Sequence, residues 1–375
     1  MKIAIDARAA TWYHGTGIGT YTENVLANLL NIDKTNDYLL YWSGNNYSYF
    51  KKNNCKIVMT SKKHQRFFQN HYFPKNLNSE NIDLYHVPQN GIGLIPDINC
   101  PKVVTIHDLI PYIMPETVGK GYLMKFLKEM PHIIENSNGI ITVSEFSKRD
   151  ILRFFPIDPN KIHVTPLAAN SKFKPLDKQV CKNLIKEKYN ISSDFLLYMG
   201  GFSDRKNVHS LIEAFSKLYK NIDEDISLVL LGSYRDSSQK LVNLVNSLGM
   251  EDHIIFAGFI PEDDVPVFYN ASIGFVYPSF YEGFGLPPLE AMHCGTPVIT
   301  SNLTSIPEVV GDSGILINPY NINELIDAMG NLVTNRSLQD ELSLKGLNKS
   351  KEFSWESTAI NTLKAYESIS ECPNF

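Results

Sequence analysis

Two glutamates on either side of a glycine–proline turn are the residues of this chain best suited to chemistry. They are Glu282 and Glu290, eight residues apart in the segment YEGFGLPPLEAM at residues 281–292. Proline is favoured at the first position of a helix, so we expect a helix to begin at Pro287 or Pro288. Glu290 would then lie in the first turn, and Glu282 on the loop before it. The free N–H groups of a helix N-terminus bind anions, and carboxylates accept hydroxyl hydrogen bonds. The segment therefore indicates a ligand that is anionic in the middle and hydroxylated at both ends, such as a nucleotide sugar.

A pair of neighbouring cations, Arg205 and Lys206, forms a second candidate. The segment YMGGFSDRKN places Gly201 at the end of an apolar run and the two cations just before a helical pattern that begins at Val208. Adjacent cations on such a loop can neutralise a diphosphate and stabilise it as a leaving group. A solvated surface pair is the alternative, and it fits the neighbouring glycines less well.

Two motifs in the first half could contribute to the same chemistry. Residues 11–21, TWYHGTGIGTY, place Gly17 and Gly19 between a strand and a helix. Such a turn lets a phosphate approach the backbone, although the spacing differs from the dinucleotide fingerprint and close packing is the alternative. His107 follows a predicted strand at the carboxyl edge, where open α/β sheets bind ligands. It could donate to a sugar hydroxyl or help to move a proton; a structural histidine is the alternative.

The elements that position these residues alternate along the chain. Several of the predicted strands are apolar on both faces, as in a covered parallel sheet. The predicted strands are 2–5, 38–42, 84–87, 103–106, 139–143, 195–199, 227–231, 253–256, 273–276, 297–300 and 315–317, and amphipathic helices are predicted at 20–31, 147–154, 208–219, 237–248 and 322–334. This alternation predicts an α/β protein with two Rossmann-like, doubly wound domains. A polar, proline-containing stretch at 170–177 sets the expected domains at 1–172 and 173–354, followed by a helix at 355–370.

Composition narrows the class of protein. A chain of 375 residues favours two domains, and a net charge of −5 gives no indication of a nucleic-acid partner. The five cysteines (Cys55, Cys100, Cys181, Cys294 and Cys372) are scattered and odd in number, so we expect neither a disulfide framework nor a zinc site. No apolar run reaches transmembrane length, and the N-terminus is typical of a buried strand and not of a signal peptide. We expect a cytoplasmic protein.

Residues 51–75 stand out by charge. They carry seven lysines and arginines and no acidic residue, with four aromatic residues interleaved. One interpretation is a surface that meets anionic lipid or a phosphate-linked acceptor, at the inner face of the membrane. The other, which we favour slightly, is a solvated loop and helix whose aromatic side chains face the core.

A metal-binding spacing also occurs once. Asp223-Glu224-Asp225 contains D-x-D, which metal-dependent sugar transferases use. It lies between a predicted helix and a strand, on the side opposite a strand's carboxyl end, so a polar turn is the better interpretation. We expect no metal and no cofactor beyond a nucleotide-sugar co-substrate.

Taken together, these motifs resemble those of the GT4 family of retaining glycosyltransferases, which have the GT-B fold. The resemblance runs along nearly the whole chain in the same order. The spacing from Glu282 to Glu290 looks like the family's E-x7-E motif, the loop at Gly17 and Gly19 looks like its N-terminal glycine loop, and the stretch from Gly201 to Lys206 is similar to its phosphate-binding stretch.

The resemblance implies an arrangement and a set of roles. Two Rossmann-like domains would face each other across a central cleft, and the helix of 355–375 would cross back to the first domain. Arg205 and Lys206 would bind the diphosphate, Glu290 the ribose, and Glu282 the transferred sugar. The backbone at Phe284, Gly285 and Leu286 would hold that sugar, Gly17 and Gly19 would approach the phosphate, and His107 would contact the sugar near the reacting carbon.

The resemblance also suggests the reaction. The text around Asp6 and Arg8, with that around Arg205 and Lys206, looks most like the mannosyl- and rhamnosyltransferase branch, which builds bacterial surface polysaccharides on lipid carriers. It implies a retaining, metal-independent hexosyltransferase, with GDP-mannose as the favoured donor and a glycan or lipid-linked acceptor. Two alternatives stay open: a nucleotide-sugar 2-epimerase of the same architecture, and a non-catalytic scaffold of a polysaccharide assembly complex.

Overall fold

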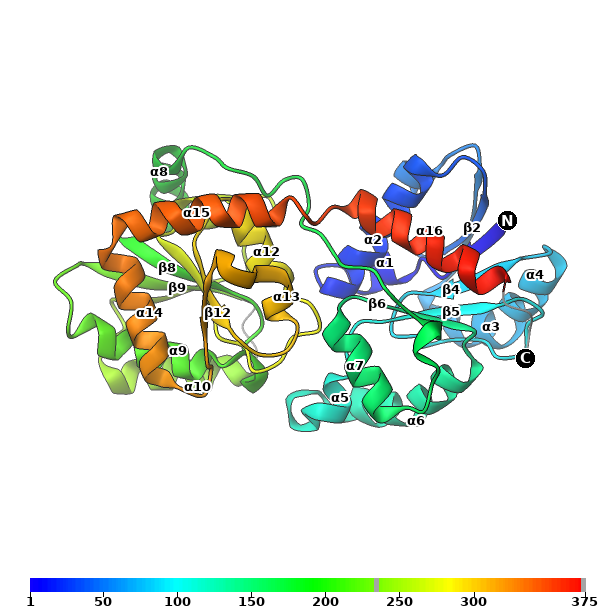
Figure 1. Ribbon diagram of the computed structural model, residues 1–375, viewed down its shortest axis with the longest axis horizontal. Coiled ribbons are helices and arrows are strands. Elements are labelled where there is room, and N and C mark those ends of the chain that lie inside the picture. Colours follow the sequence, from blue (N-terminus) through cyan, green and yellow to red (C-terminus); the bar gives the residue numbers. More distant parts are fainter. Residues whose placement is uncertain (233–235, 372–375) are drawn as a thin grey trace. The chain divides into compact units, whose positions relative to one another are not determined.

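The computed structural model, which describes residues 1–232 and 236–371, consists of two compact units (Figure 1). Unit 1 is Met1–Ala168 with the C-terminal segment from Ser354, and unit 2 is Ala169–Phe353. The sequence placed the first boundary after residue 172. Unit 2 begins ahead of that boundary, at Ala169, and Lys172 already contacts it, since Lys172 Nζ lies 3.2 Å from Glu262 Oε2.

Unit 1 is built on a parallel sheet of seven strands. Its order is β3-β2-β1-β4-β5-β6-β7, which is the doubly wound arrangement that the alternation of strands and helices predicted. The strands are β1 (Lys2–Ile5), β2 (Asp37–Trp42), β3 (Cys55–Met59), β4 (Leu84–Val87), β5 (Lys102–Ile106), β6 (Gly139–Thr142) and β7 (Ile162–Val164). Strands β1, β4, β5 and β6 are almost wholly buried, which explains why most of their residues are apolar.

Helices cover both faces of this sheet. One face shares a buried apolar cluster with α4, α6 and α7, and on the other face α2 and α16 pack together. The helices and helical turns of unit 1 are α1 (Ala9–Trp12), α2 (Gly17–Ile32), η1 (Ser48–Phe50), η2 (Lys62–His64), α3 (Gln65–Phe67), η3 (Phe68–Tyr72, π-helical), α4 (Phe73–Ser79), α5 (Ile110–Ile113), η4 (Pro115–Thr117), α6 (Lys120–Asn136), α7 (Glu145–Phe154), η5 (Pro159–Lys161) and α16 (Trp355–Glu371).

Unit 2 repeats the architecture with a parallel sheet of six strands in the order β10-β9-β8-β11-β12-β13. Its strands are β8 (Asp194–Met199), β9 (Ile226–Leu231), β10 (Ile254–Gly258), β11 (Gly274–Tyr277), β12 (Val298–Ser301) and β13 (Ile315–Ile317). Its helices and helical turns are α8 (Lys178–Tyr189), η6 (Asp204–Lys206), α9 (Val208–Tyr219), α10 (Asp236–Leu248), α11 (Val265–Ala271), α12 (Leu286–His293), α13 (Ile306–Val310), η7 (Gly311–Ser313), α14 (Ile322–Thr334) and α15 (Arg336–Ser350). Helix α9 packs against α10 and α14, α8 packs against α11, and α12 packs against α15 (Figure 1).

Two strands of unit 1 were not predicted, and both lie at an edge of the sheet. Strand β3 pairs only with β2, and its residues are partly exposed with a lysine at Lys56. Strand β7 has three residues and pairs only with β6. An edge strand buries too little surface to need an apolar run, so neither segment carried the pattern that identified the central strands.

Two smaller observations bear on the sequence-based expectations. Cys55, Cys100, Cys181 and Cys294 are free thiols, and Cys372 lies outside the described residues. Within 1–232 and 236–371, none of the helices has both the length and the apolar character that crossing a bilayer requires.

A buried polar network attaches the C-terminal helix to the sheet of unit 1. The Tyr366 hydroxyl lies 2.7 Å from His86 Nδ1, and Nε2 of the same imidazole lies 2.7 Å from Thr105 Oγ1. Thr105 Oγ1 in turn lies 3.0 Å from the Tyr21 hydroxyl on α2. Burial lowers the pKa of His86 to about 3, so its ring is neutral and needs both partners. The network therefore ties three separate elements to α16.

We expect Tyr366→Phe to destabilise the protein by about 1–3 kcal/mol, because the change leaves a buried imidazole nitrogen without its partner. Chemical denaturation of the full chain measures the effect. Tyr49→Phe, on an exposed ring of the same unit, is the matched control and should stay within about 0.5 kcal/mol of the wild type. Equal stability of the two variants would show that the network does not hold the helix.

Candidate functional site

The Arg205–Lys206 pair lies on the loop between β8 and α9. The turn η6 carries both residues, and Asn207 ends it in a left-handed conformation with φ 56°. Asparagine tolerates this conformation better than most residues. The Asn207 Nδ2 group also donates to the Pro319 carbonyl at 2.9 Å, so the end of the loop is fixed to the segment after β13. Asn207 thus fixes the end of the loop in two ways, through its backbone conformation and through the hydrogen bond of its side chain.

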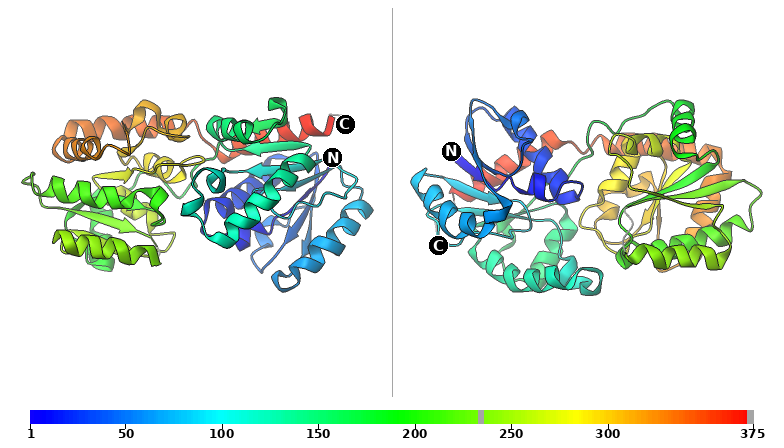
Figure 2. Two further views of the ribbon diagram at one scale, coloured as in Figure 1. Left: turned by 90° about the horizontal axis from the view of Figure 1, so that it is seen from below. Right: turned by 180° about the vertical axis from the view of Figure 1, so that it is seen from behind.

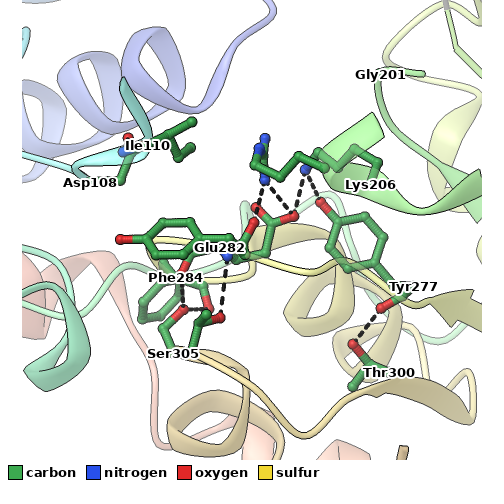
Figure 3. A network of polar contacts seen from close by, with 12 residues as sticks. Asp108, Ile110, Gly201, Lys206, Tyr277, Glu282, Phe284, Thr300 and Ser305 are labelled. Atoms are coloured by element: carbon green, nitrogen blue, oxygen red, sulfur yellow. Dashed lines mark hydrogen bonds and ion pairs between the residues drawn. The ribbon is translucent and has the colours of Figure 1, made fainter. Parts of the chain in front are cut away.

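Both cations contact one carboxylate, that of Glu282. Lys206 Nζ donates to Glu282 Oε1 at 2.7 Å, and Arg205 Nη1 lies 3.0 Å from the same oxygen. Lys206 also donates to the Tyr277 hydroxyl and lies over that ring, 4.8 Å from its centroid (Figure 3). All three charged side chains are nearly buried, with exposed fractions of 11–14%. Predicted separately from the sequence, Arg205, Lys206 and Glu282 are therefore brought together in unit 2.

Electrostatics keep Glu282 ionised in spite of its burial. Burial alone would favour the neutral acid, but the charges of Arg205 and Lys206 and the Lys206 hydrogen bond outweigh it and lower the pKa of Glu282 to about 2. The cluster carries two positive charges and one negative charge at neutral pH, so it keeps a net charge of +1. Such a cluster attracts an anion.

The loop that carries Glu282 is held by two residues of the segment after β12. Thr304 Oγ1 accepts a hydrogen bond from the Glu282 N–H at 3.2 Å, and Thr304 itself has φ 61°, which is rare for a β-branched residue. The Ser305 hydroxyl contacts the carbonyls of Glu282 and Phe284 at 2.8 and 2.9 Å (Figure 3). The sequence of residues 301–308, which follows the predicted strand 297–300, has two interpretations: it lines the same site, or it begins a helix with Ser305 as the N-cap. Ser305 is at the N-cap position of α13 but makes no capping bond, and its hydroxyl donates to the carbonyls of the Glu282 loop instead.

The helix after this loop begins earlier than predicted. Helix α12 starts at Leu286, so Glu290 lies beyond its first turn, contrary to our expectation. The cause is Gly285, whose φ of 114° turns the chain into the helix one residue before the prolines. A side chain at Gly285 would also meet Ile306 Cδ1 at 2.7 Å. The turn therefore requires glycine for its conformation, and any side chain would also displace the end of Ile306.

Glu290 occupies a different environment from Glu282. Its Oε2 atom lies 3.3 Å from the Tyr269 hydroxyl, which also points to the Pro287 carbonyl at 3.2 Å. Burial raises the pKa of Glu290 to about 8, against the opposing effect of the Tyr269 hydrogen bond. The two glutamates of the motif therefore differ at neutral pH: Glu282 is an anion, and Glu290 is mostly a neutral acid that can donate as well as accept.

The glycine motif belongs to unit 1, where Gly17 and Gly19 lie in the first turn of α2 and not before the helix, which was predicted to begin at residue 20. A Cβ on Gly19 would lie 2.2 Å from the Tyr13 carbonyl oxygen, so only glycine allows this approach. Thr16 caps α2, its Oγ1 accepting from the Gly19 N–H at 3.4 Å. Gly17 is the first residue of the helix. Close packing thus explains Gly19, and the role in phosphate binding stays a prediction.

His107 also lies in unit 1, directly after β5. It is buried and packs edge-on against the Tyr21 ring at 4.8 Å. Its Nε2–H group donates to the Pro88 carbonyl at 2.9 Å, and its backbone N–H donates to Asn90 Oδ1 at 2.8 Å. Burial lowers the pKa of His107 to about 4, so the imidazole is neutral at physiological pH. These contacts give His107 a structural role, and its contact with the sugar stays a prediction.

Several residues around the ion cluster were not singled out in the sequence. They are Tyr277 and Tyr269, together with Asn207, which the sequence showed only as the last residue of the basic motif. Tyr277 ends β11 at the carboxyl edge of the sheet, one residue beyond the predicted strand. A tyrosine at the carboxyl end of a predicted strand was therefore the feature by which the sequence could have identified Tyr277. The positive φ of Thr304 cannot be predicted from its residue type.

The described residues, 1–232 and 236–371, contain no group of three or more histidine, cysteine, aspartate or glutamate side chains that could hold a metal ion. The D-x-D segment lies in the exposed connection between α9 and β9.

Two parallel-sheet units of Rossmann type, one with a cationic loop beside a buried carboxylate, define a nucleotide-binding class of α/β protein. Comparison with family models identifies the class further. Residues 51–172 match the model described as Glycosyltransferase Family 4, and residues 182–349 match the one described as Glycosyl transferases group 1. The chain belongs to glycosyltransferase family 4 and is a glycosyltransferase.

Characterised relatives agree with this assignment. O-antigen chain mannosyltransferase B of Escherichia coli is 35% identical over 71% of this chain and 70% of its own length. Serotype-specific mannosyltransferase WbdA, also of Escherichia coli, is 31% identical over 72% of this chain, but the match spans only 34% of the length of WbdA.

Solved structures show the same fold. The structure of HepE from Anabaena in complex with UDP and glucose has a TM-score of 0.78 and 16% identity, and the match covers 98% of this chain and 100% of that one. At this identity the likeness defines the architecture only. The chain has the two-domain, Rossmann-like GT-B fold that the motifs predicted.

Substitution of the predicted donor-site residues tests their assignment. We expect Lys206→Ala to lower kcat/KM for sugar transfer by about a hundredfold or more, because it removes a charge placed for the leaving diphosphate. Glu290→Ala should weaken nucleotide binding by roughly tenfold through lost hydrogen bonds. Lys220→Ala, an exposed lysine of the same unit, is the control and should behave as wild type. If both site variants keep full transfer activity, the site has been placed wrongly.

The raised pKa of Glu290 predicts a pH dependence of stability. Its carboxyl group ionises near 4.5 when unfolded and near 8 when folded, so over this interval the folded state holds a proton that the unfolded state has lost. The contribution of Glu290 to stability therefore falls as pH rises from 4.5 to 8. In Glu290→Gln this decline is absent, and the stability of the variant relative to wild type should increase over the same range. Denaturation curves measured at several pH values check this, and parallel pH profiles would contradict it.

Proposed function

We propose that this enzyme transfers mannose from GDP-mannose to a glycan or lipid-linked acceptor in the synthesis of a surface polysaccharide. The observation that carries the proposal is the contact of Arg205 and Lys206 with one buried carboxylate at the carboxyl edge of the unit 2 sheet. The choice of hexose rests on the relatives, both of which are mannosyltransferases. A hexosyltransferase of this kind needs a site for a diphosphate and for a sugar.

The cations would bind the diphosphate and stabilise it as it leaves. Because Glu282 already holds them in place at 2.7 and 3.0 Å, little reorganisation is required when the anion arrives. The net positive charge of the cluster favours the negative charge that builds up on the leaving group. Lys206 is further positioned by the Tyr277 hydroxyl and ring.

The sugar and the ribose would use the two ends of the E-x7-E segment. Glu282, as an anion, would accept hydrogen bonds from hydroxyls of the transferred sugar, helped by the backbone at Phe284, Gly285 and Leu286. Glu290, as a mostly neutral acid, would bind the ribose hydroxyls. Both expectations come from the family resemblance and are supported by the different protonation of the two glutamates.

Unit 1 would supply the remaining contacts. Gly17 and Gly19 would approach the phosphate, and His107 would contact the sugar near the reacting carbon. Transfer would retain the anomeric configuration through front-face attack, with the leaving phosphate as the base, and would need no metal ion. A lipid-linked acceptor would bring the enzyme to the cytoplasmic face of a membrane.

A thermal-shift panel tests the proposed donor. The panel contains GDP, UDP, dTDP, ADP and their common sugar conjugates, each with and without EDTA. A ligand at about 100 times its dissociation constant adds about 2.7 kcal/mol of stability. We expect selective stabilisation by GDP and GDP-mannose that EDTA leaves unchanged. Preference for another base would contradict the donor assignment, loss of the shift in EDTA would contradict metal independence, and no shift with any nucleotide would contradict the proposed donor site.

A further inference from the structure

Helix α6 of unit 1 presents apolar side chains to solvent where a soluble helix normally carries polar ones. Met124 is 67% exposed, and Tyr122 and Leu127 are 38% and 37% exposed. Three exposed lysines, at 120, 125 and 128, alternate with them. The opposite side of the helix buries Phe126 and Met130 in the core of the unit. The outer side of α6 is therefore both cationic and apolar.

The segment from Lys62 to Lys75 has the same character. Its lysines and Arg66 are exposed, and Phe67 is 55% exposed. We favoured a solvated segment whose aromatic residues face the core, and only part of this is correct. Phe73 is fully buried, and Phe68 and Tyr72 are partly buried against the core, but Phe67 points outward. The backbone between them includes one π-helical turn at η3.

The two segments meet at a pocket of about 560 Å³. Gln69, Asn70 and Pro74 line it from the first segment and Lys128 from α6, together with residues 93–97 and the later α6 residues Glu129, His132, Ile133 and Asn136. Helices α4 and α6 also contribute to the same apolar cluster, so both lie on one face of the sheet, as the view from below shows (Figure 2). Residues 62–75 and 120–128 are therefore one surface, which we call the cationic face.

The charge of this face is strongly unbalanced, although the chain as a whole has a net charge of −5. Residues 62–75 and 120–128 contain seven lysines and arginines and no aspartate or glutamate. Two acidic residues, Asp97 and Glu129, line the pocket beside it, and Glu129 Oε1 lies 3.9 Å from Lys125 Nζ. Because the Lys125–Glu129 ion pair is separated by 3.9 Å and exposed to solvent, it does not neutralise the surface.

We propose that the cationic face docks on the surface of a bilayer that contains anionic lipid. This inference rests on the proposed lipid-linked acceptor, and it identifies the part of the enzyme that meets the membrane. Apolar side chains such as Met124 and Phe67 would enter the boundary between headgroups and acyl chains, while the lysines around them would contact anionic headgroups. The pocket between the two segments would then open toward the lipid surface.

Vesicle co-sedimentation tests the proposal on the full chain. The wild type should bind vesicles of phosphatidylcholine with about 30% phosphatidylglycerol, and bind pure phosphatidylcholine much less. Binding should weaken as salt is added, because salt screens the lysines. Met124→Ser with Leu127→Ser should reduce the partition coefficient about tenfold. Lys125→Gln with Lys128→Gln should reduce it about fivefold for each lysine removed.

Leu344→Ser is the matched control, since Leu344 is 62% exposed but lies on α15 of unit 2; it should bind vesicles like the wild type. A wild type that ignores anionic vesicles overturns the proposal, and so does equal binding by wild type and the α6 variant. If the wild type self-associates in place of binding lipid, the face is a contact between copies. Nucleotide-induced thermal shifts of the same proteins separate this result from the proposed function, since the α6 variant should keep them.

Discussion

The structure of the site depends on one electrostatic constraint: the side chains of two cations, Arg205 and Lys206, and of one carboxylate, Glu282, are nearly buried together. Taking three charges out of water is costly unless each is paired and hydrogen-bonded. Arg205 and Lys206 both pair with Glu282, the Tyr281 carbonyl accepts from Arg205, and the Phe280 N–H donates to the Arg205 carbonyl at 2.9 Å. These bonds join the loop after β8 to the loop after β11. The same bonds that pair the charges therefore also fix the course of both loops.

The backbone around the cluster adopts conformations that most residues avoid. Asn207, Gly285 and Thr304 all have positive φ, and each stands where a loop of the site must turn. Such conformations cost free energy and persist only when their surroundings enforce them. Here the enforcing contacts are bonds from Asn207 to the Pro319 carbonyl, from Glu282 to Thr304, and from Ser305 to the Glu282 loop. Precision in the site is therefore obtained from hydrogen bonds between loops, on a framework of buried parallel strands.

Much of the fold was readable in the sequence because central parallel strands must be apolar on both faces. Strands such as β1 and β4, inside the sheet of unit 1, were predicted to the residue, whereas β3 and β7, at the edges of the same sheet, carry no continuous apolar run and were missed. The contact of Arg205, Lys206 and Glu282 agrees with the motifs, since residues after parallel strands gather at one edge. The predicted start of α12 was wrong because Gly285 adopts a positive φ, which most residues avoid, and so lets the helix begin at Leu286. The positive φ of Thr304 could not be predicted, because this conformation is imposed by contacts and not by the residue type.

The central claim is that Arg205 and Lys206 form the diphosphate site, and calorimetric titration tests it most directly. GDP and guanosine are titrated into the wild type and into Lys206→Ala, so that the affinity gained from the diphosphate is measured by itself. The account predicts a large gain in the wild type that collapses in the variant, while guanosine binds both proteins equally. An undiminished gain in the variant would contradict it and place the diphosphate elsewhere.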